Sequence, residues 1–318
     1  MKIVFMGTPN FAATALQELL NEELEIAAVY TQPDKPQGRK MKMTAPPVKE
    51  LALHYNLPIL QPKTLKDEEV TAQMQEISPD LIIVVAYGKI LPPEILHIPS
   101  MGCVNLHASL LPKYRGAAPI QRAILAGEKE TGVTTMFMDE GLDTGDILLQ
   151  EKVLIAENEN SIELFDKMAH VGAKLLVKTI YALSNKSITP ILQDSEKSSY
   201  AAMITKEEGC IDFCQSAQKI HNIIRGLSGW PIAYAYLGNK KLKIHQSVLL
   251  NDLDNTTGNP GELVDTKRCI IQCQDGAIEL LKVQLEGGKV MSGKDFLNGR
   301  KMKMGEILKT EKESPNQE

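Results

Sequence analysis

The sequence lacks any apolar run that approaches the roughly 18 residues of a membrane-spanning helix. Its longest candidate, residues 81–86, has only the length of one β-strand. The N-terminus also lacks the cationic start, the long apolar stretch and the small-residue cleavage site of a signal peptide. We therefore expect a cytoplasmic protein without a membrane partner.

The sequence is also poor in the patterns that indicate a metal or a nucleotide cofactor. Its five cysteines include two pairs at x3 spacing, whereas structural zinc usually needs C-x2-C, and no H-E-x-x-H occurs. The turn Gly7–Ala12 has one glycine where the dinucleotide fingerprint needs three, and no phosphate-binding G-x-x-x-x-G-K-[ST] sequence is present. These absences predict that the protein uses neither a metal nor NAD.

What is present is the composition of a globular protein, with 43% hydrophobic and 24% charged residues. A length of 318 residues suggests two domains. Residues 1–189 alternate between short apolar strands and amphipathic helices, which is typical of a doubly wound, Rossmann-like α/β fold with a mostly parallel sheet. Ligands in such folds bind beyond the carboxyl ends of the strands.

The pattern of predicted strands and helices changes near residue 190. A polar linker is predicted over 190–207, and short strands separated by Gly, Asn and Asp turns follow over 208–310. This spacing predicts a small β-barrel domain that is OB-like. A polar tail occupies 311–318.

Charge is distributed unevenly along the chain. The formal net charge is −5, but residues 35–49 contain five basic residues and no acidic one. A cationic segment on an acidic protein indicates an anionic partner, and the alternative is a solvated loop whose lysines have no partner.

Polar residues gather where a buried strand is expected to end. Asn105 and His107 are two residues apart, so their side chains leave one face of the strand. An amide beside an imidazole can stabilise an oxyanion and move a proton. The loop 139–146 adds four acids that could face the imidazole or bind a metal. The alternative is that His107 is a core residue whose ring nitrogens form hydrogen bonds within the protein.

Residues 105–119, followed by the loop 139–146, closely resemble the formyltransferases that use 10-formyltetrahydrofolate, and the similarity runs from residue 1 to about residue 300. The resemblance implies that Asn105, His107 and Asp143 form the catalytic group. It implies that two segments bind the folate: Ser109, Leu110, Leu111 and Pro112, and Val84, Val85, Ala86 and Tyr87. The second segment could pair with the pterin ring through its backbone groups.

The segment 31–43 resembles a loop that the tRNA-dependent branch of this family inserts into the acceptor stem. The resemblance implies formyl transfer, by direct amine attack, to the α-amino group of initiator methionyl-tRNA, for translation initiation. It makes 1–189 the catalytic domain and 208–310 the tRNA-binding domain of a monomer. The candidate tRNA contacts are Arg39, which matches the critical arginine of that loop, with Lys35, Lys40, Lys42, Lys206 and Arg225.

Two alternatives to this function stay open. The acceptor could be an amino-sugar nucleotide, because those formyltransferases resemble both domains. The chain could also be a non-catalytic module that binds RNA or folate. Whether the loop 32–49 is ordered without tRNA is likewise open, because proline, glycine and lysine dominate it.

Overall fold

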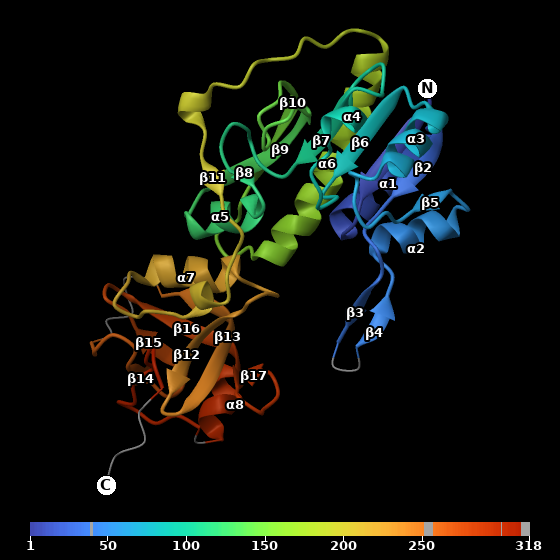
Figure 1. The fold of residues 1–318 in the computed structure, drawn as a ribbon. Helices are drawn as coiled ribbons and strands as arrows, with labels where there is room; N and C mark the ends of the chain where they lie inside the picture. The colour runs from blue at the N-terminus through green and yellow to red at the C-terminus, as the bar shows by residue number, and fades with distance from the viewer. Residues whose placement is uncertain (39–40, 251–256, 300, 313–318) are drawn as a thin grey trace. The chain divides into compact units, whose positions relative to one another are not determined.

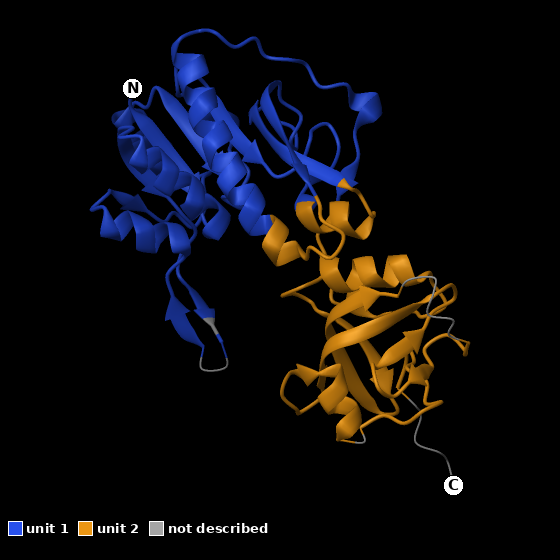
Figure 2. Cartoon of the chain, turned by 180° about the vertical axis from the view of Figure 1, so that it is seen from behind, with its two compact units in different colours: residues 1–119, 130–154, 165–201 blue, residues 120–129, 155–164, 202–318 orange. Residues whose placement is uncertain are grey.

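The computed structural model describes residues 1–38, 41–250, 257–299 and 301–312. The chain forms two compact units, which Figure 2 shows in different colours. The predicted linker 190–207 is divided between them at residue 201. Unit 1 consists of Met1–Pro119, Glu130–Leu154 and Phe165–Ala201, and unit 2 consists of Ile120–Lys129, Ile155–Leu164 and Ala202–Glu318.

Unit 1 is built on a seven-stranded sheet with the order β10-β9-β7-β6-β1-β2-β5. The five strands from β7 to β5 are parallel, while β9 is antiparallel to both of its neighbours. The strands are β1 (Ile3–Gly7), β2 (Ile26–Tyr30), β5 (Ile59–Leu60), β6 (Leu81–Val85), β7 (Cys103–His107), β9 (Glu130–Phe137) and β10 (Ile147–Leu154).

Helices cover both faces of this sheet (Figure 1). Every residue of β1 and β6 is buried, because alternate side chains enter the two layers of core. Val4 and Ile82 pack with residues of α3, and α6 lies so close to the other face that a Cβ at Gly172 would meet Leu106. The helices of this unit are α1 (Asn10–Asn21), α2 (Pro47–His54), α3 (Glu68–Ile77), α4 (Pro93–Leu96) and most of α6 (Ser161–Ser184), whose first four residues belong to unit 2.

Unit 2 contains an antiparallel sheet with the order β12-β13-β16-β15-β14, to which β17 adds beside β16. The chain near its C-terminal end bridges the two edges, through Tyr236 with Lys309 and Glu262 with Ile307, so the sheet closes. The strands are β12 (Ala233–Leu237), β13 (Lys240–Leu249), β14 (Leu263–Asp265), β15 (Ile270–Gln272), β16 (Ala277–Leu285) and β17 (Met291–Ser292).

Unit 2 also contains the helices α7 (Ala217–Gly226) and α8 (Gly293–Asn298), and all of α5 (Pro119–Leu125) except its first residue. The hydroxyl of Ser216 accepts a hydrogen bond from the Lys219 N–H and caps α7. Ile220 and Ile224 of this helix are buried in the core of the barrel with Ile244. The mostly parallel α/β domain and the antiparallel β domain that follows it confirm the predicted fold class.

The cationic segment is more regular than its composition suggests. Strands β3 (Lys35–Gln37) and β4 (Lys42–Thr44) pair as an antiparallel hairpin, and Figure 1 shows it projecting from the sheet of unit 1. At its base, Lys49 forms an ion pair of 2.8 Å with Asp34. Hydrogen bonds from Gln61 and Lys49 hold the pKa of the Asp34 carboxyl below its ordinary value.

The remaining short elements are β8 (Arg115–Gly116), β11 (Tyr200–Ala201) and the 3₁₀ turns η1 (Ser195–Lys197) and η2 (Glu207–Gly209). Strand β8 pairs in parallel with β11, so the segment after β7 lies beside the segment that follows α6. Within the described residues, no helix has both the length and the apolar character needed to cross a bilayer. Of the predicted polar tail, residues 313–318 lie outside the described residues.

Candidate active site

The site is built on β7, whose neighbours in the sheet are β6 and β9. Asn105 and His107 share one face of β7 with Cys103, which is part of the core on the side of α3 and α4. Asn105 lies opposite Val84 of β6 and Met136 of β9. Its side chain is half-buried, and no hydrogen bond of its amide occurs in the described part of the chain. This amide is therefore free to bind a ligand.

His107 is the last residue of β7 and is buried, with 6% of its surface exposed. Its Nε2 lies 2.9 Å from the carbonyl oxygen of Tyr114, and its Nδ1 lies 3.6 Å from Oδ2 of Asp143. Both ring nitrogens thus face acceptors. A doubly protonated ring can donate toward both of them, whereas a neutral ring can donate toward only one.

Asp143 reaches His107 from the loop that joins β9 to β10. Its Oδ2 accepts a hydrogen bond of 2.8 Å from the Gly116 N–H, and its backbone has a φ of 55°. That left-handed conformation is uncommon for residues other than glycine, although aspartate tolerates it better than most. Within the same loop, Asp139 accepts hydrogen bonds from the Thr144 hydroxyl at 2.7 and 2.8 Å. Asp139 therefore closes the loop, whereas Asp143 is presented to the imidazole.

The first predicted folate segment follows directly after β7. Ser109 is fully buried, and its hydroxyl donates a hydrogen bond of 2.6 Å to the Lys113 carbonyl. Thr134 of β9 donates to the Ser109 carbonyl at 2.6 Å and accepts from the Leu111 N–H at 3.2 Å. Leu111 is buried, while Leu110 and Pro112 are half-buried. The Ser109 hydroxyl therefore shapes the segment, and Leu110 and Pro112 expose surface to a ligand.

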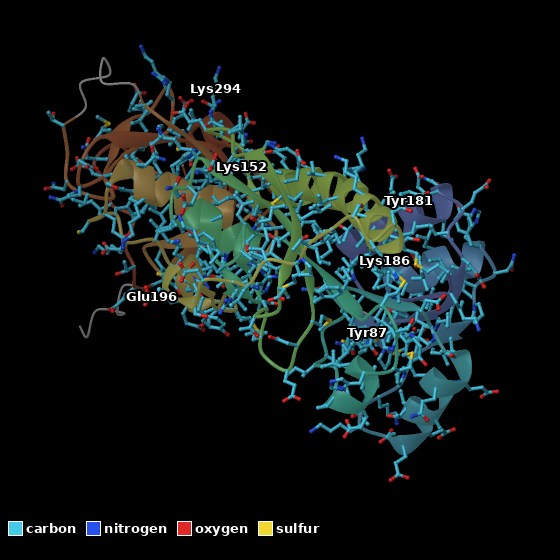
Figure 3. The ribbon with its side chains drawn as sticks, turned by 90° about the horizontal axis from the view of Figure 1, so that it is seen from above. Tyr87, Lys152, Tyr181, Lys186, Glu196 and Lys294 are labelled. Carbon is cyan, nitrogen blue, oxygen red and sulfur yellow. The ribbon has the colours of Figure 1, made fainter. Side chains whose placement is uncertain are left out.

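The second predicted folate segment is the end of β6 and the two residues after it. Val84, Val85 and Tyr87 have buried side chains, and Ala86 is exposed with a φ of 45°. Tyr87, which Figure 3 labels, accepts hydrogen bonds at its carbonyl from the Thr8 hydroxyl at 3.0 Å and the Gln32 amide at 3.1 Å. A ligand at this segment would thus meet backbone and the methyl group of Ala86.

Two phenols lie buried behind this segment. The hydroxyls of Tyr30 and Tyr87 have no hydrogen-bond partner among the described residues. Burial raises the pKa of Tyr30 and of Tyr87 to about 12, so both remain neutral. They form part of the core that supports the end of β6.

The predicted tRNA contacts have different surroundings. Lys35 and Lys42 are exposed on the β3–β4 hairpin, and Lys206 is exposed in unit 2. Arg39 and Lys40 lie outside the described residues. By contrast, Arg225 is only 7% exposed, and its guanidinium donates to the Asn222 side chain and to the Glu159 carbonyl. Burial lowers the pKa of Arg225. Arg225 is therefore an internal residue of unit 2.

Sequence reasoning missed Gln193, which lies in the predicted linker. Its side chain is 7% exposed and contacts both the Arg115 guanidinium and the loop that carries Asp143. Nothing in the pattern of residues 190–207 distinguishes Gln193 from its polar neighbours. Only the pairing of segments far apart in the chain reveals it.

The donor set of the site suits an organic substrate. No cluster of three or more His, Cys, Asp or Glu residues with the geometry to hold a metal ion occurs among the residues that the structure describes. Asn105, His107 and Asp143 instead provide an amide, an imidazole and a carboxylate, a set that can stabilise an oxyanion and transfer protons.

Comparisons with known proteins identify the class of this site. The family model described as formyl transferase matches residues 1–180, and the model of the formyl transferase C-terminal domain matches residues 203–301. The chain therefore belongs to the formyl transferase family.

Individual relatives indicate the branch of the formyl transferase family. A methionyl-tRNA formyltransferase of Caldicellulosiruptor saccharolyticus is 50% identical over 97% of this chain and 100% of its own length. That of Caldanaerobacter subterraneus is 46% identical over 97% of this chain and 100% of its length. Within its family, the chain thus falls among the methionyl-tRNA formyltransferases, which confirms the resemblance found in residues 105–119 and 139–146.

Solved structures agree on the fold. The sugar 3N-formyl transferase WlaRD, determined in the presence of dTDP and 5-N-formyl-THF, matches with a TM-score of 0.67 and 25% identity over 88% of this chain and 97% of its own. The N-formyltransferase of Helicobacter canadensis, in complex with folinic acid and dTDP-3-aminofucose, matches with a TM-score of 0.68 and 23% identity over 88% of this chain and 99% of its own.

Proposed function

We propose that this chain transfers the formyl group of 10-formyltetrahydrofolate to the α-amino group of initiator methionyl-tRNA. The observation that carries the proposal is the meeting of the Asp143 carboxylate with the His107 ring, on the strand face that also presents the unpaired Asn105 amide. Full-length similarity to methionyl-tRNA formyltransferases supports the choice of acceptor. The folate supplies the formyl group as an amide-like carbon on its N10.

Asn105 stabilises the charge that develops during the transfer. When the amine adds to the formyl carbon, negative charge builds on the formyl oxygen. Hydrogen-bond donors held in place before the reaction lower the energy of such an oxyanion, because they need no reorganisation. The Asn105 amide meets this requirement, since it sits on a strand in the middle of the sheet and is not occupied by another protein group.

His107 and Asp143 manage the protons. The attacking amine loses a proton and N10 of the leaving folate gains one, so the transfer consumes no proton overall. A free α-amino group has a pKa of about 7.7–8.0, and esterification lowers it, so the neutral nucleophile exists at pH 7. Asp143 accepts the proton from the amine and passes one to N10, and the His107 ring, which faces Asp143, stabilises the carboxylate between the two transfers. The pair therefore acts as one proton-transfer unit.

The folate and the tRNA would use different surfaces. Leu110, Pro112 and the backbone around Ala86 border the formyl site, because β6 and the segment after β7 flank Asn105. The exposed Lys35 and Lys42, together with Arg39 and Lys40, would contact RNA phosphates through the β3–β4 hairpin, and Lys206 would add a contact in unit 2.

We also infer that the protein acts as a monomer in the cytoplasm. Asn105, His107, Asp143 and Gly116 all come from unit 1 of a single chain, so the catalytic group needs no residue from a second copy. The proposed acceptor is an aminoacyl-tRNA, which is made and used in the compartment of the ribosome.

A comparison of acceptors tests the proposal. The purified chain is incubated with 10-formyltetrahydrofolate and either methionyl-tRNA or a dTDP-amino sugar, and the formylated product and the deformylated folate are measured. We expect formylmethionyl-tRNA, formed at a rate that falls steeply as salt rises, because phosphate contacts release counterions. Turnover of the sugar alone would identify a sugar formyltransferase. Binding of RNA or folate without turnover would identify a non-catalytic module.

A further inference from the structure

Gln193 is the one buried residue in an exposed strap. The strap, residues 191–200, runs along the surface of unit 1, and its other residues are exposed, Glu196 among them (Figure 3). It is pinned at one end by the pairing of Ile191 with Ile147 and at the other by the pairing of β11 with β8. The inward side chain of Gln193 is therefore held between two anchored points.

Both ends of the Gln193 amide are used. Its Nε2 donates to the carbonyl of Asp143 at 2.9 Å and to that of Gly145 at 2.7 Å. Its Oε1 accepts from Nε of Arg115 at 3.0 Å and from Nη2 at 2.7 Å. Because the guanidinium can only donate, Arg115 fixes the orientation of the amide, and the NH₂ group must point at the loop.

The loop needs such a tether because of the direction of β9. This strand is antiparallel to β7, so it ends beside the start of β7, where the Met138 N–H donates to the Cys103 carbonyl at 2.8 Å. His107 lies at the opposite end of β7. The loop 139–146 must therefore fold back along β7 to bring Asp143 to the imidazole.

Two hydrogen bonds hold Asp143 in this folded-back position. The Gly116 N–H binds its carboxylate, and the Gln193 amide binds its backbone carbonyl. The second bond acts on a residue whose φ of 55° is uncommon for a side chain other than glycine. Without Gln193, the loop loses the side-chain hydrogen bonds that tie its Asp143 and Gly145 carbonyls to the strap, and the Gly116 N–H alone holds Asp143 near His107.

We propose that Gln193, oriented by Arg115, is a positioning residue that sets the distance between the Asp143 carboxylate and His107. The inference rests on the proposed function, because it gives Gln193 a role through the Asp143–His107 pair. Gln193 is buried, so it acts through the loop and the strand residues it holds.

Two substitutions of Gln193 test the hydrogen bonds that its amide makes. Gln193→Glu keeps an acceptor for Arg115 and presents only acceptors to the two loop carbonyls, so it repels the loop. Gln193→Met keeps the length of the side chain and loses both sets of hydrogen bonds. Leu192→Gln, at a neighbouring strap residue that is 82% exposed, is the matched control.

The test measures formyl transfer by Gln193→Glu, Gln193→Met and the control, with thermal melting to verify folding. A displacement of about 1 Å in a catalytic group can cost about 10²-fold in rate. We expect kcat to fall by roughly that factor in both variants, while KM for folate and for the acceptor stays within about twofold and the control matches wild type. Equal kcat in wild type and both variants would overturn the proposal, as would a loss confined to KM.

A double-mutant cycle separates positioning from general loosening. If Gln193 acts through Asp143, then Gln193→Met costs little in an Asp143→Asn background, because the group it positions is already disabled. A loss of the same size in both backgrounds would show that Gln193 serves only the fold. The cycle uses whichever formyl acceptor the wild-type chain turns over, so a failure of the proposed acceptor leaves this test intact.

Discussion

Two buried histidines of this protein have opposite surroundings. His107 in unit 1 is 6% exposed and His221 in unit 2 is 1% exposed, so burial alone does not distinguish them. His107 faces a carbonyl and the Asp143 carboxylate. His221 lies 3.0 Å from the Ser247 hydroxyl and 3.3 Å from the Glu157 carbonyl.

The partners determine which form of each ring is satisfied. A neutral His221 donates from Nε2 to the Glu157 carbonyl and accepts at Nδ1 from the Ser247 hydroxyl, which uses both nitrogens. His107 has acceptors on both sides, so a neutral ring leaves one of them without a donor. Because both nitrogens of its neutral ring have partners, His221 is suited to a structural role, whereas His107, beside a carboxylate at the end of a strand, is suited to move a proton.

The largest effect expected from this contrast is on the rate of formyl transfer, when residues of the candidate active site are replaced. We expect His107→Ala and Asn105→Ala each to lower the rate of formyl transfer by about 10²–10³, because each removes a group that acts on the developing charge or its proton. Folate affinity should survive, since the predicted folate contacts come from other residues, 84–87 and 109–112. Single-turnover rates and a folate titration measure the two quantities. Near-wild-type turnover in either variant would remove that residue from the catalytic group.

Substitution of His221 is expected to have a smaller effect, and to change stability rather than turnover. His221→Ala leaves the Ser247 hydroxyl and the Glu157 carbonyl without their partner, and an unpaired buried polar group costs about 1–3 kcal/mol. Thermal unfolding should therefore begin at a lower temperature, with turnover per folded molecule unchanged. A drop in turnover as large as that of His107→Ala would erase the distinction between the two histidines.

The strands and helices with strong periodicity could be predicted from the sequence. Residues 81–86 read as a buried strand, and β6 spans Leu81–Val85. Apolar residues recur at helical spacing over 216–227, and α7 spans Ala217–Gly226. These elements are predictable because burial against a single core imposes a repeat on neighbouring residues.

Features that depend on distant pairing could not be predicted. The β3–β4 hairpin has two strands of three residues with no apolar alternation, so it reads as a loop. Arg225 belongs to a helix whose polar side should meet solvent, yet backbone carbonyls from another segment bury its guanidinium. The fold-back of the Asp143 loop depends on the antiparallel insertion of β9, which no local pattern records.

The smallest expected effect is a difference in how stability depends on pH. Burial, together with the positive charge of nearby Arg225, holds the pKa of His221 below its ordinary value of about 6.5, although the hydrogen bond to the Glu157 carbonyl opposes the shift. The unfolded chain therefore takes up a proton at this residue as the pH falls through about 6.5, while the folded chain does not. Stability is lost from that pH downward, until the pH reaches the folded pKa.

Each unit by which the folded pKa of His221 is lowered contributes about 1.4 kcal/mol to this loss. His221→Gln removes the titrating group and keeps an amide that can both donate and accept, so the variant should lose less melting temperature than wild type between pH 7.5 and pH 5.5. Thermal unfolding of both proteins at the two pH values measures the difference. Parallel curves would mean that His221 keeps the same proton affinity in the folded and unfolded chain, and its hydroxyl and carbonyl neighbours would then not select the neutral ring.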